Sequence, residues 1–108
     1  MEVQKARNDL VTASTTPVLI AQRQPERVAI YIVNTGTQNV TISKGAGSVT
    51  AGAGIVLNAG GGAFSESDSE SFKCFKGDIF AIVSAGTSTI AVSEQWIDRN
   101  AKGKEDWA

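Results

Sequence analysis

The residues best placed to bind a ligand are three carboxylates in the run from Ser65 to Glu70. Glu66, Asp68 and Glu70 alternate with serines. In an extended segment every second side chain projects to the same side, so these carboxylates could gather a hard cation such as calcium. The run lacks the glycine and the distant glutamate of a calcium-binding loop. We therefore interpret it as a solvated acidic loop, with a cation site as the alternative, and expect no metal and no cofactor.

The other residue types argue against catalysis. The chain has no histidine, the commonest general base, and its single cysteine excludes an intramolecular disulfide. Cys74 alternates with Phe72, so we expect it to be a small buried hydrophobe. No spacing singles out a Ser–Lys pair, and a domain of 108 residues offers little room for two acids across a cleft. We predict that the protein is not an enzyme and has no catalytic residue.

Glycine clusters invite a phosphate-binding interpretation, which their context does not support. The clusters are Gly45-Ala46-Gly47, Gly52-Ala53-Gly54 and Gly60-Gly61-Gly62. A phosphate loop places lysine after its glycines, whereas Lys44 precedes them, and a dinucleotide fingerprint requires a helix that the sequence does not predict. We interpret these segments as turns and surface loops.

Charge is distributed unevenly along a chain whose net charge is only -1. Between Val28 and Ser65 the one charged side chain is Lys44. A small domain leaves much of its surface exposed, so this uncharged stretch predicts contact with copies of itself or with a larger partner. Basic residues elsewhere are mixed with acidic ones, and we expect no nucleic-acid partner. No apolar run reaches the length of a membrane span or resembles a signal peptide, so we expect no membrane association.

The alternation of apolar and polar residues predicts about seven short strands. These are residues 17–22, 27–34, 40–44, 55–58, 71–75, 79–84 and 89–96. They indicate an all-β chain, an antiparallel β-sandwich or jelly-roll-like domain over residues 17–97. We expect the polar residues 1–16 to form an N-terminal arm and the charged residues 98–108 to form a C-terminal tail.

The strongest predicted strand is apolar on both faces. Val28, Ile30 and Ile32 are expected in the core, with Ala29, Tyr31 and Val33 on the opposite face. Residues 79–83 repeat the pattern. A strand that is apolar on both sides is covered on both sides. The outer cover would come from a neighbouring subunit, which makes the protein an oligomer, or from residues 1–16 folding back.

Four motifs give the chain a recognisable arrangement. An arginine-led strand ends in Asn-x-Gly, and a Leu-x-x-Gly loop, a Lys-Gly-Asp-Ile turn and a closing Val-x-Glu strand follow. In this sequence they are Arg27 to Gly36, Leu57 to Gly60, Lys76 to Ile79 and Val92 to Glu94. Over residues 17–95 the chain resembles the β-sandwich capsid decoration (cement) proteins of tailed bacteriophages.

This resemblance implies a structural virion protein, made in the host cytoplasm, that decorates the outer capsid surface as a homotrimer. It would stabilise the capsid by binding across subunits of the major capsid protein, without a cofactor. Apolar residues on the expected arm, the outer face and the tail are the candidates for partner binding, because edge strands and buried aromatics recur at interfaces. They are Leu10, Val11, Pro17, Val18, Tyr31 and Trp107.

The alternative is a recognition module on the virion surface, tail or fibre that binds a host glycan or protein. Its binding groups would be Phe64, beside the glycine run, and the acidic segment that follows it.

Overall fold

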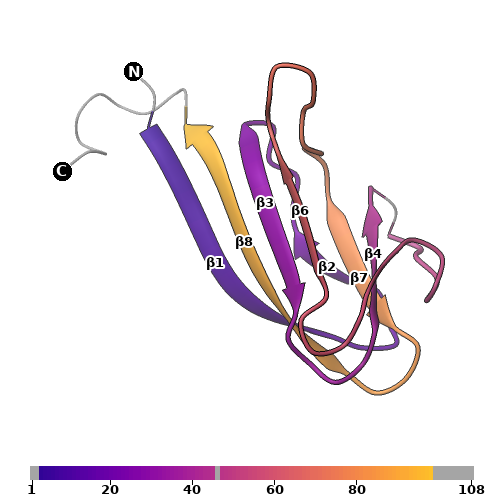
Figure 1. The fold of residues 1–108 in the computed structure, drawn as a ribbon. Coiled ribbons are helices and arrows are strands. Elements are labelled where there is room, and N and C mark those ends of the chain that lie inside the picture. The colour runs from indigo at the N-terminus through magenta and orange to yellow at the C-terminus, as the bar shows by residue number, and fades with distance from the viewer. Residues whose placement is uncertain (1–2, 46, 99–108) are drawn as a thin grey trace.

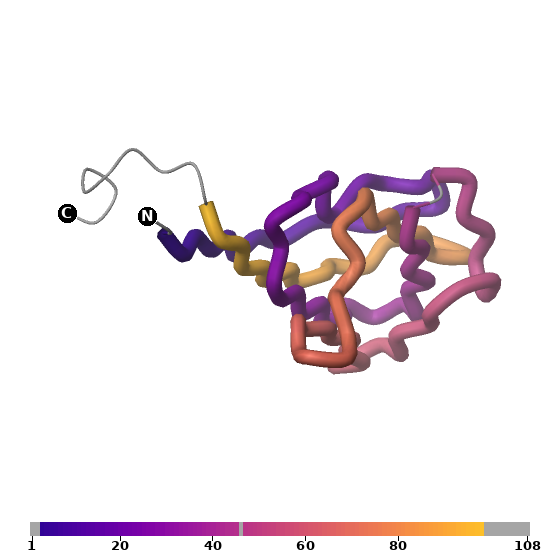
Figure 2. The backbone as a smooth tube through the Cα atoms, turned by 90° about the horizontal axis from the view of Figure 1, so that it is seen from above, coloured from indigo at the N-terminus to yellow at the C-terminus, as the bar shows by residue number. Residues whose placement is uncertain are grey.

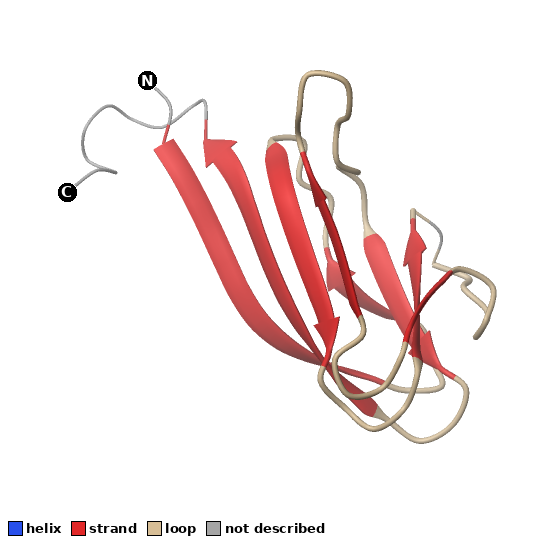
Figure 3. Cartoon of the chain, viewed as in Figure 1, coloured by secondary structure: helices blue, strands red, loops and turns tan. Residues whose placement is uncertain are grey.

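The computed structural model describes residues 3–45 and 47–98, which fold into eight β-strands in two layers (Figures 1 and 3). The strands are β1 (Val3–Ala13), β2 (Val18–Ala21), β3 (Arg27–Asn34), β4 (Val40–Lys44), β5 (Ile55–Leu57), β6 (Ala63–Ser67), β7 (Ile79–Val83) and β8 (Ser88–Asp98). These residues contain no helix, and hence none long and apolar enough to cross a membrane.

The strands pair as a long hairpin that is rolled into a sandwich. β1 pairs with β8, β2 with β7, β3 with β6 and β4 with β5, all antiparallel. The resulting sheets have the orders β1-β8-β3-β6, which we call sheet A, and β2-β7-β4-β5, which we call sheet B. This is the connectivity of a jelly roll, so the predicted all-β sandwich is confirmed.

The core lies between the two sheets and is aliphatic. Sheet A contributes Ile30, Ile32, Ile90 and Val92, and sheet B contributes Ile42, Ile79, Ala81 and Val83 among others; none of these is more than 2% exposed. Each fully buried side chain of valine or isoleucine size contributes roughly 1.5–3 kcal/mol. The expectation that Ile30 and Ile32 point inward is confirmed, whereas Val28 is only half-buried.

A β-bulge explains the position of Val28. The register of β3 against β8 shifts between Arg27 and Ala29, so that Arg27 pairs with Trp96 and Ala29 with Gln95. The extra residue in a bulge changes which side chains face inward. As a result Arg27, which the alternation of β3 would place outside, lies on the core side and is completely buried.

The buried Arg27 guanidinium connects both sheets and two loops. Its Nε donates to Glu94 Oε2 at 2.8 Å, and its terminal nitrogens donate to three backbone carbonyls. Those carbonyls belong to Gln22 (2.8 Å), Phe75 (2.7 Å) and Gly77 (3.2 Å). Glu94 also accepts from Arg7 on β1 at 2.9 Å. A buried charge is tolerated only when it is paired and hydrogen-bonded, and this one is.

At the other end of β3, a buried asparagine has a similar role. The Asn34 amide donates to the carbonyls of Gln38 and Leu57, and its oxygen accepts from Ser88 Oγ at 2.7 Å. Gly36 follows in the turn, where a Cβ atom would lie 2.1 Å from Ser88 Oγ and 2.6 Å from the Thr89 nitrogen. Only glycine fits this close approach, which holds the turn against β8.

The segment expected as an N-terminal arm is mostly a strand of the sandwich. Within residues 1–16, Val3–Ala13 form β1, which pairs with β8 along its whole length without a register shift. Most of its residues are polar, so it lacks the alternating apolar positions by which a half-buried strand is recognised in a sequence. Figure 2 shows the start of β1 and the end of β8 extending together beyond the rest of the sandwich. Of the expected tail, only Asp98 lies within the described residues.

The predicted strand at 71–75 is wrong, and an unpredicted strand, β6, precedes it. Carboxylates hold residues 68–75 in a loop instead. Asp68 accepts from the Cys74 backbone N–H and Glu66 from that of Phe75, each at 2.9 Å. Because side chains satisfy these backbone donors, the alternating aromatic residues do not join a sheet.

The outer face of sheet B is partly covered by the chain itself. Gly52 N–H donates to Thr41 Oγ1 at 2.8 Å, and Gly47 lies against the Phe80 ring. Val49, in the same loop, is buried. The glycine-rich segment thus covers part of the apolar outer side of β7, while Leu19 and Val56 on the neighbouring strands remain exposed.

We expect Arg27→Met to lower the free energy of unfolding by about 3–5 kcal/mol, because it removes one member of a buried ion pair. The three carbonyl acceptors lose their donors as well. Urea unfolding followed by circular dichroism measures the change. Arg23→Met is the matched control, since Arg23 is exposed and surface substitutions change stability by only about 0.5 kcal/mol. A similar small loss for both variants would contradict the central role of Arg27.

Candidate contact face

The outer face of sheet A is defined by the strand register. Directly paired residues on neighbouring strands project to the same side of a sheet. Leu10, Ala91, Val33 and Ala63 therefore form one row across the four strands. Of the residues on this side, which also include the paired Thr12 and Thr89 at the end of the sheet, we call the following the contact face: Gln4, Ala6, Asn8, Leu10, Ala29, Tyr31, Val33, Ala63, Ser65, Ser67, Ala91, Ser93, Gln95 and Ile97.

None of these residues carries a charge, although sheet A contains several charged residues. All of the charged residues occupy the positions on the side toward sheet B. They are Lys5, Arg7, Asp9, Arg27, Glu66, Glu94 and Asp98. In an ordinary antiparallel sheet the hydrophobic side chains face inward and the polar ones face water. Here the charges are inside or at the margins, and the outside is uncharged.

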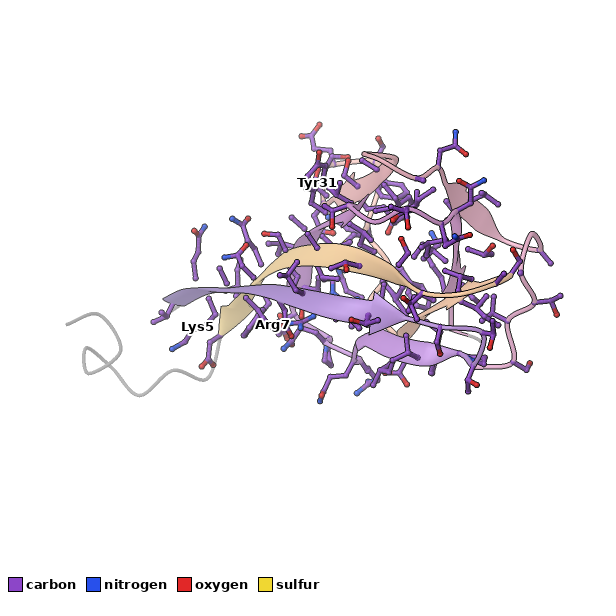
Figure 4. All side chains as sticks on the ribbon, turned by 90° about the horizontal axis from the view of Figure 1, so that it is seen from below. Lys5, Arg7 and Tyr31 are labelled. Carbon is purple, nitrogen blue, oxygen red and sulfur yellow. The ribbon has the colours of Figure 1, made fainter. Side chains whose placement is uncertain are left out.

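The centre of the contact face is a shallow apolar groove. It has a volume of about 560 Å³, lies between Leu10 on β1 and Tyr31 on β3, and is bordered by Asp9 beside Leu10. Its floor is β8, where Ala91 and Ser93 are small. Leu10 is 67% exposed and Tyr31 51% exposed, which is costly for side chains of this size. In Figure 4, Tyr31 lies on the far side of the β8 ribbon from Lys5 and Arg7.

The structure brings together two of the predicted partner-binding residues, Leu10 and Tyr31. Val11 and Val18 are elsewhere, because both pack against the core, and Pro17 lies in the connection between β1 and β2. Trp107 is outside the described residues. Tyr31 is recognisable in the sequence from the two apolar faces of its strand. Ala63, Ala91 and Ser93 are not, because their small side chains give no signal until the register is known.

The acidic segment does not form a cation site among the described residues. Glu66 points toward sheet B and accepts from Lys44 at 2.6 Å, whereas Asp68 pairs with Lys76 at 3.0 Å. Phe64 packs against the core instead of standing at a loop tip. Phe64, Glu66 and Asp68 are therefore engaged in contacts within the fold, whereas Glu70 is exposed.

Two carboxyl groups in this cluster have lowered pKa values. Burial opposes the ionisation of Glu66, but hydrogen bonds from Lys44 and the Phe75 N–H, with the positive charge of Lys44, hold its pKa below the ordinary 4.5. The Cys74 N–H and Lys76 lower the pKa of Asp68 below the ordinary 3.8. Both carboxylates therefore favour the folded state when they are ionised.

The single cysteine is buried, as predicted. Its thiol donates to the Arg27 carbonyl at 3.3 Å. Burial raises the pKa of Cys74 against the effect of the neighbouring Lys76 ammonium, so the thiol remains protonated and unreactive. Lys76 also donates to the Arg27 carbonyl, which ties the loop before β7 to the bulge.

Comparison with known proteins supports the fold. No protein-family model and no curated protein match the chain. A solved structure from the study "Bacillus endospore appendages form a novel family of disulfide-linked pili" has a TM-score of 0.52. It is 17% identical in sequence, and the alignment covers 88% of this chain and 87% of that one. At this identity the likeness shows a shared fold.

We expect the folded state to lose stability as the pH falls below 4.5. The unfolded chain takes up protons at Glu66 and Asp68 before the folded chain does, so acid favours unfolding. Thermal unfolding measured over an acid pH series tests this. Glu66→Gln should be less stable near neutral pH and should show a shallower acid dependence, whereas the control Glu70→Gln, at an exposed position, should follow the natural chain. An unchanged pH dependence for Glu66→Gln would contradict the assignment.

Proposed function

We propose that this chain is a structural protein that acts by docking its contact face against another protein surface, and that it is not an enzyme. The observation that carries the proposal is the placement of every charged residue of sheet A away from that face. Charged side chains on a surface favour hydration, and their depletion is typical of the centre of protein interfaces. Tyrosine, which stands at the centre here, is enriched at such sites.

The ionisable groups of the sandwich support the same proposal, because they serve the fold. Arg27 and Arg7 share Glu94, Lys44 pairs with Glu66, and Lys76 pairs with Asp68. The first three pairs each join two different strands, and the fourth closes the loop between β6 and β7 on itself. These ion pairs thus fix the strands and loops that position the contact face.

Capsid decoration is the specific form of this role that we propose. Its support is the resemblance carried by the strand and turn motifs, all of which lie in the sandwich. On a virion, the contact face would lie against the major capsid protein or a neighbouring copy on the outer surface. The similar solved structure comes from work on disulfide-linked pili. Disulfide linkage does not transfer readily to this chain, because its one cysteine is buried.

We expect Tyr31→Asp to weaken incorporation of the chain into assembled particles by about tenfold or more, because docking would bury an unpaired carboxylate. Co-sedimentation of the purified chain with the particles measures this. Phe72→Asp is the matched control, since Phe72 is an exposed aromatic residue (47%) in a loop outside the contact face. Circular dichroism should show that both variants remain folded. Equal incorporation of both variants would rule out docking through this face.

Particles that lack the chain should rupture at a lower temperature than complete particles, because binding stabilises the assembled state. Heating both preparations while following nucleic-acid release gives the two rupture temperatures, and adding back the purified chain should restore the higher one. If the temperatures are the same, the stabilising role is wrong.

A further inference from the structure

We infer that the occupant of the contact face is a second copy of this chain, bound face to face across a twofold axis. The inference rests on the proposed function, since it names the partner of the same surface. The described residues leave the face open, with Leu10 and Tyr31 more than half exposed.

The distribution of charge favours a copy over a foreign partner. Interfaces between different proteins commonly use complementary charges to select and orient the partner. The residues of the contact face offer no charge for such selection. The charged residues of sheet A project to its other side, and of these Asp9 borders the groove. An uncharged face can meet its own copy without repulsion, which a face with net charge of either sign cannot.

The relief of the face is suited to a twofold contact. Leu10 and Tyr31 project on either side of a groove whose floor is formed by Ala91 and Ser93. In an isologous contact the same patch supplies both the projecting side chains and the groove, so that each copy fills the other. Sheets that pack face to face lie about 10 Å apart, with strands within about 30° of each other, a spacing that short side chains such as Ala29 and Ala63 permit.

The polar groups of the face can also be satisfied in such a contact. A buried tyrosine hydroxyl requires a hydrogen-bond partner. Asn8, Ser65 and Ser93 lie on the same face, and Ser93 Oγ already donates to Asn8 Oδ1 at 2.6 Å. These side chains of one copy provide acceptors and donors for Tyr31 of the other.

The extent of the face is that of a weak, transient interface. With the usual strand spacing and rise, its residues cover roughly 450 Å² of flat sheet in each copy. Two faces together approach the lower limit of about 1,200 Å² for stable complexes once side-chain relief is included. β1 is essential to this extent, since it supplies Gln4, Ala6, Asn8 and Leu10.

A single face that pairs with itself closes at two copies. The contact therefore predicts a dimer in solution, whereas the resemblance to decoration proteins implied a trimer. A trimer would require two different surfaces to meet in each contact.

The chain has one tyrosine, so 3-fluorotyrosine places a single fluorine label in the centre of the contact face. We expect sedimentation equilibrium of the labelled full chain to show a monomer–dimer equilibrium in the micromolar range. The fluorine resonance should shift with the same concentration dependence. Leu10→Asp should weaken dimerisation by about tenfold or more, whereas Phe72→Asp should dimerise like the natural chain.

A chain that stays monomeric over this range would overturn the inference, as would a dimer whose fluorine resonance does not move. These failures are distinct from failure of the proposed function. If the monomer's resonance moves only when assembled particles are added, the face docks a different protein and the proposed function stands. If the chain dimerises through the face but Tyr31→Asp still enters particles normally, the dimer stands and docking to the particle is wrong.

Discussion

The buried pairing of Arg27 with Glu94 is the interaction on which the rest of the structure depends. An arginine buried in an aliphatic sandwich must be hydrogen-bonded to a carboxylate and to several carbonyl groups. An unpaired charge there would cost more free energy than most single contacts contribute. Arg27 finds these groups on β8, on the loop after β2 and on the loop before β7. One side chain thus fixes the spacing of the two sheets and the position of both loops.

The same pairing accounts for the uncharged outer surface. Glu94 is turned inward by Arg27 and Arg7, and Glu66 is turned inward by Lys44. Because alternate residues of a strand face opposite sides, each inward charge leaves its neighbours outside. Those neighbours are alanine, serine, asparagine, glutamine, leucine and isoleucine. The stability of the fold and the character of the contact face therefore have a common origin, which is the direction in which the charged side chains point.

The two outer faces of the sandwich differ in how they are covered. The loop before β5 lies over sheet B, where it buries Val49 and contacts Phe80 and Thr41. Sheet A has no such loop among the described residues, and β1 enlarges it at one edge instead. This asymmetry leaves Phe80 and Ile82 of β7 partly or fully buried, whereas Tyr31 and Leu10 are more than half exposed.

Much of the fold could be predicted from the sequence where apolar residues alternate, as in β3, β4 and β7. Prediction failed where the alternation of apolar and polar residues does not match the backbone hydrogen bonding of the segment. β1 alternates polar residues yet pairs fully with β8, and residues 71–75 alternate like a strand although Asp68 and Glu66 occupy their backbone donors. Of the site, Tyr31 was recognisable from its strand, but its proximity to Leu10 was not, because β8, from the far end of the chain, lies between them.

The sequence alone determined that the protein is all-β and that its middle is nearly free of charge, since both follow from residue type and local spacing. The tertiary structure decided which surface is the contact face. That choice depends on the bulge at β3, which sets the direction of Arg27, and on the pairing of β1, β8, β3 and β6. Which residues of a strand face outward depends on its register against strands that are distant in sequence. A shift of that register by one residue would have placed the charges outside.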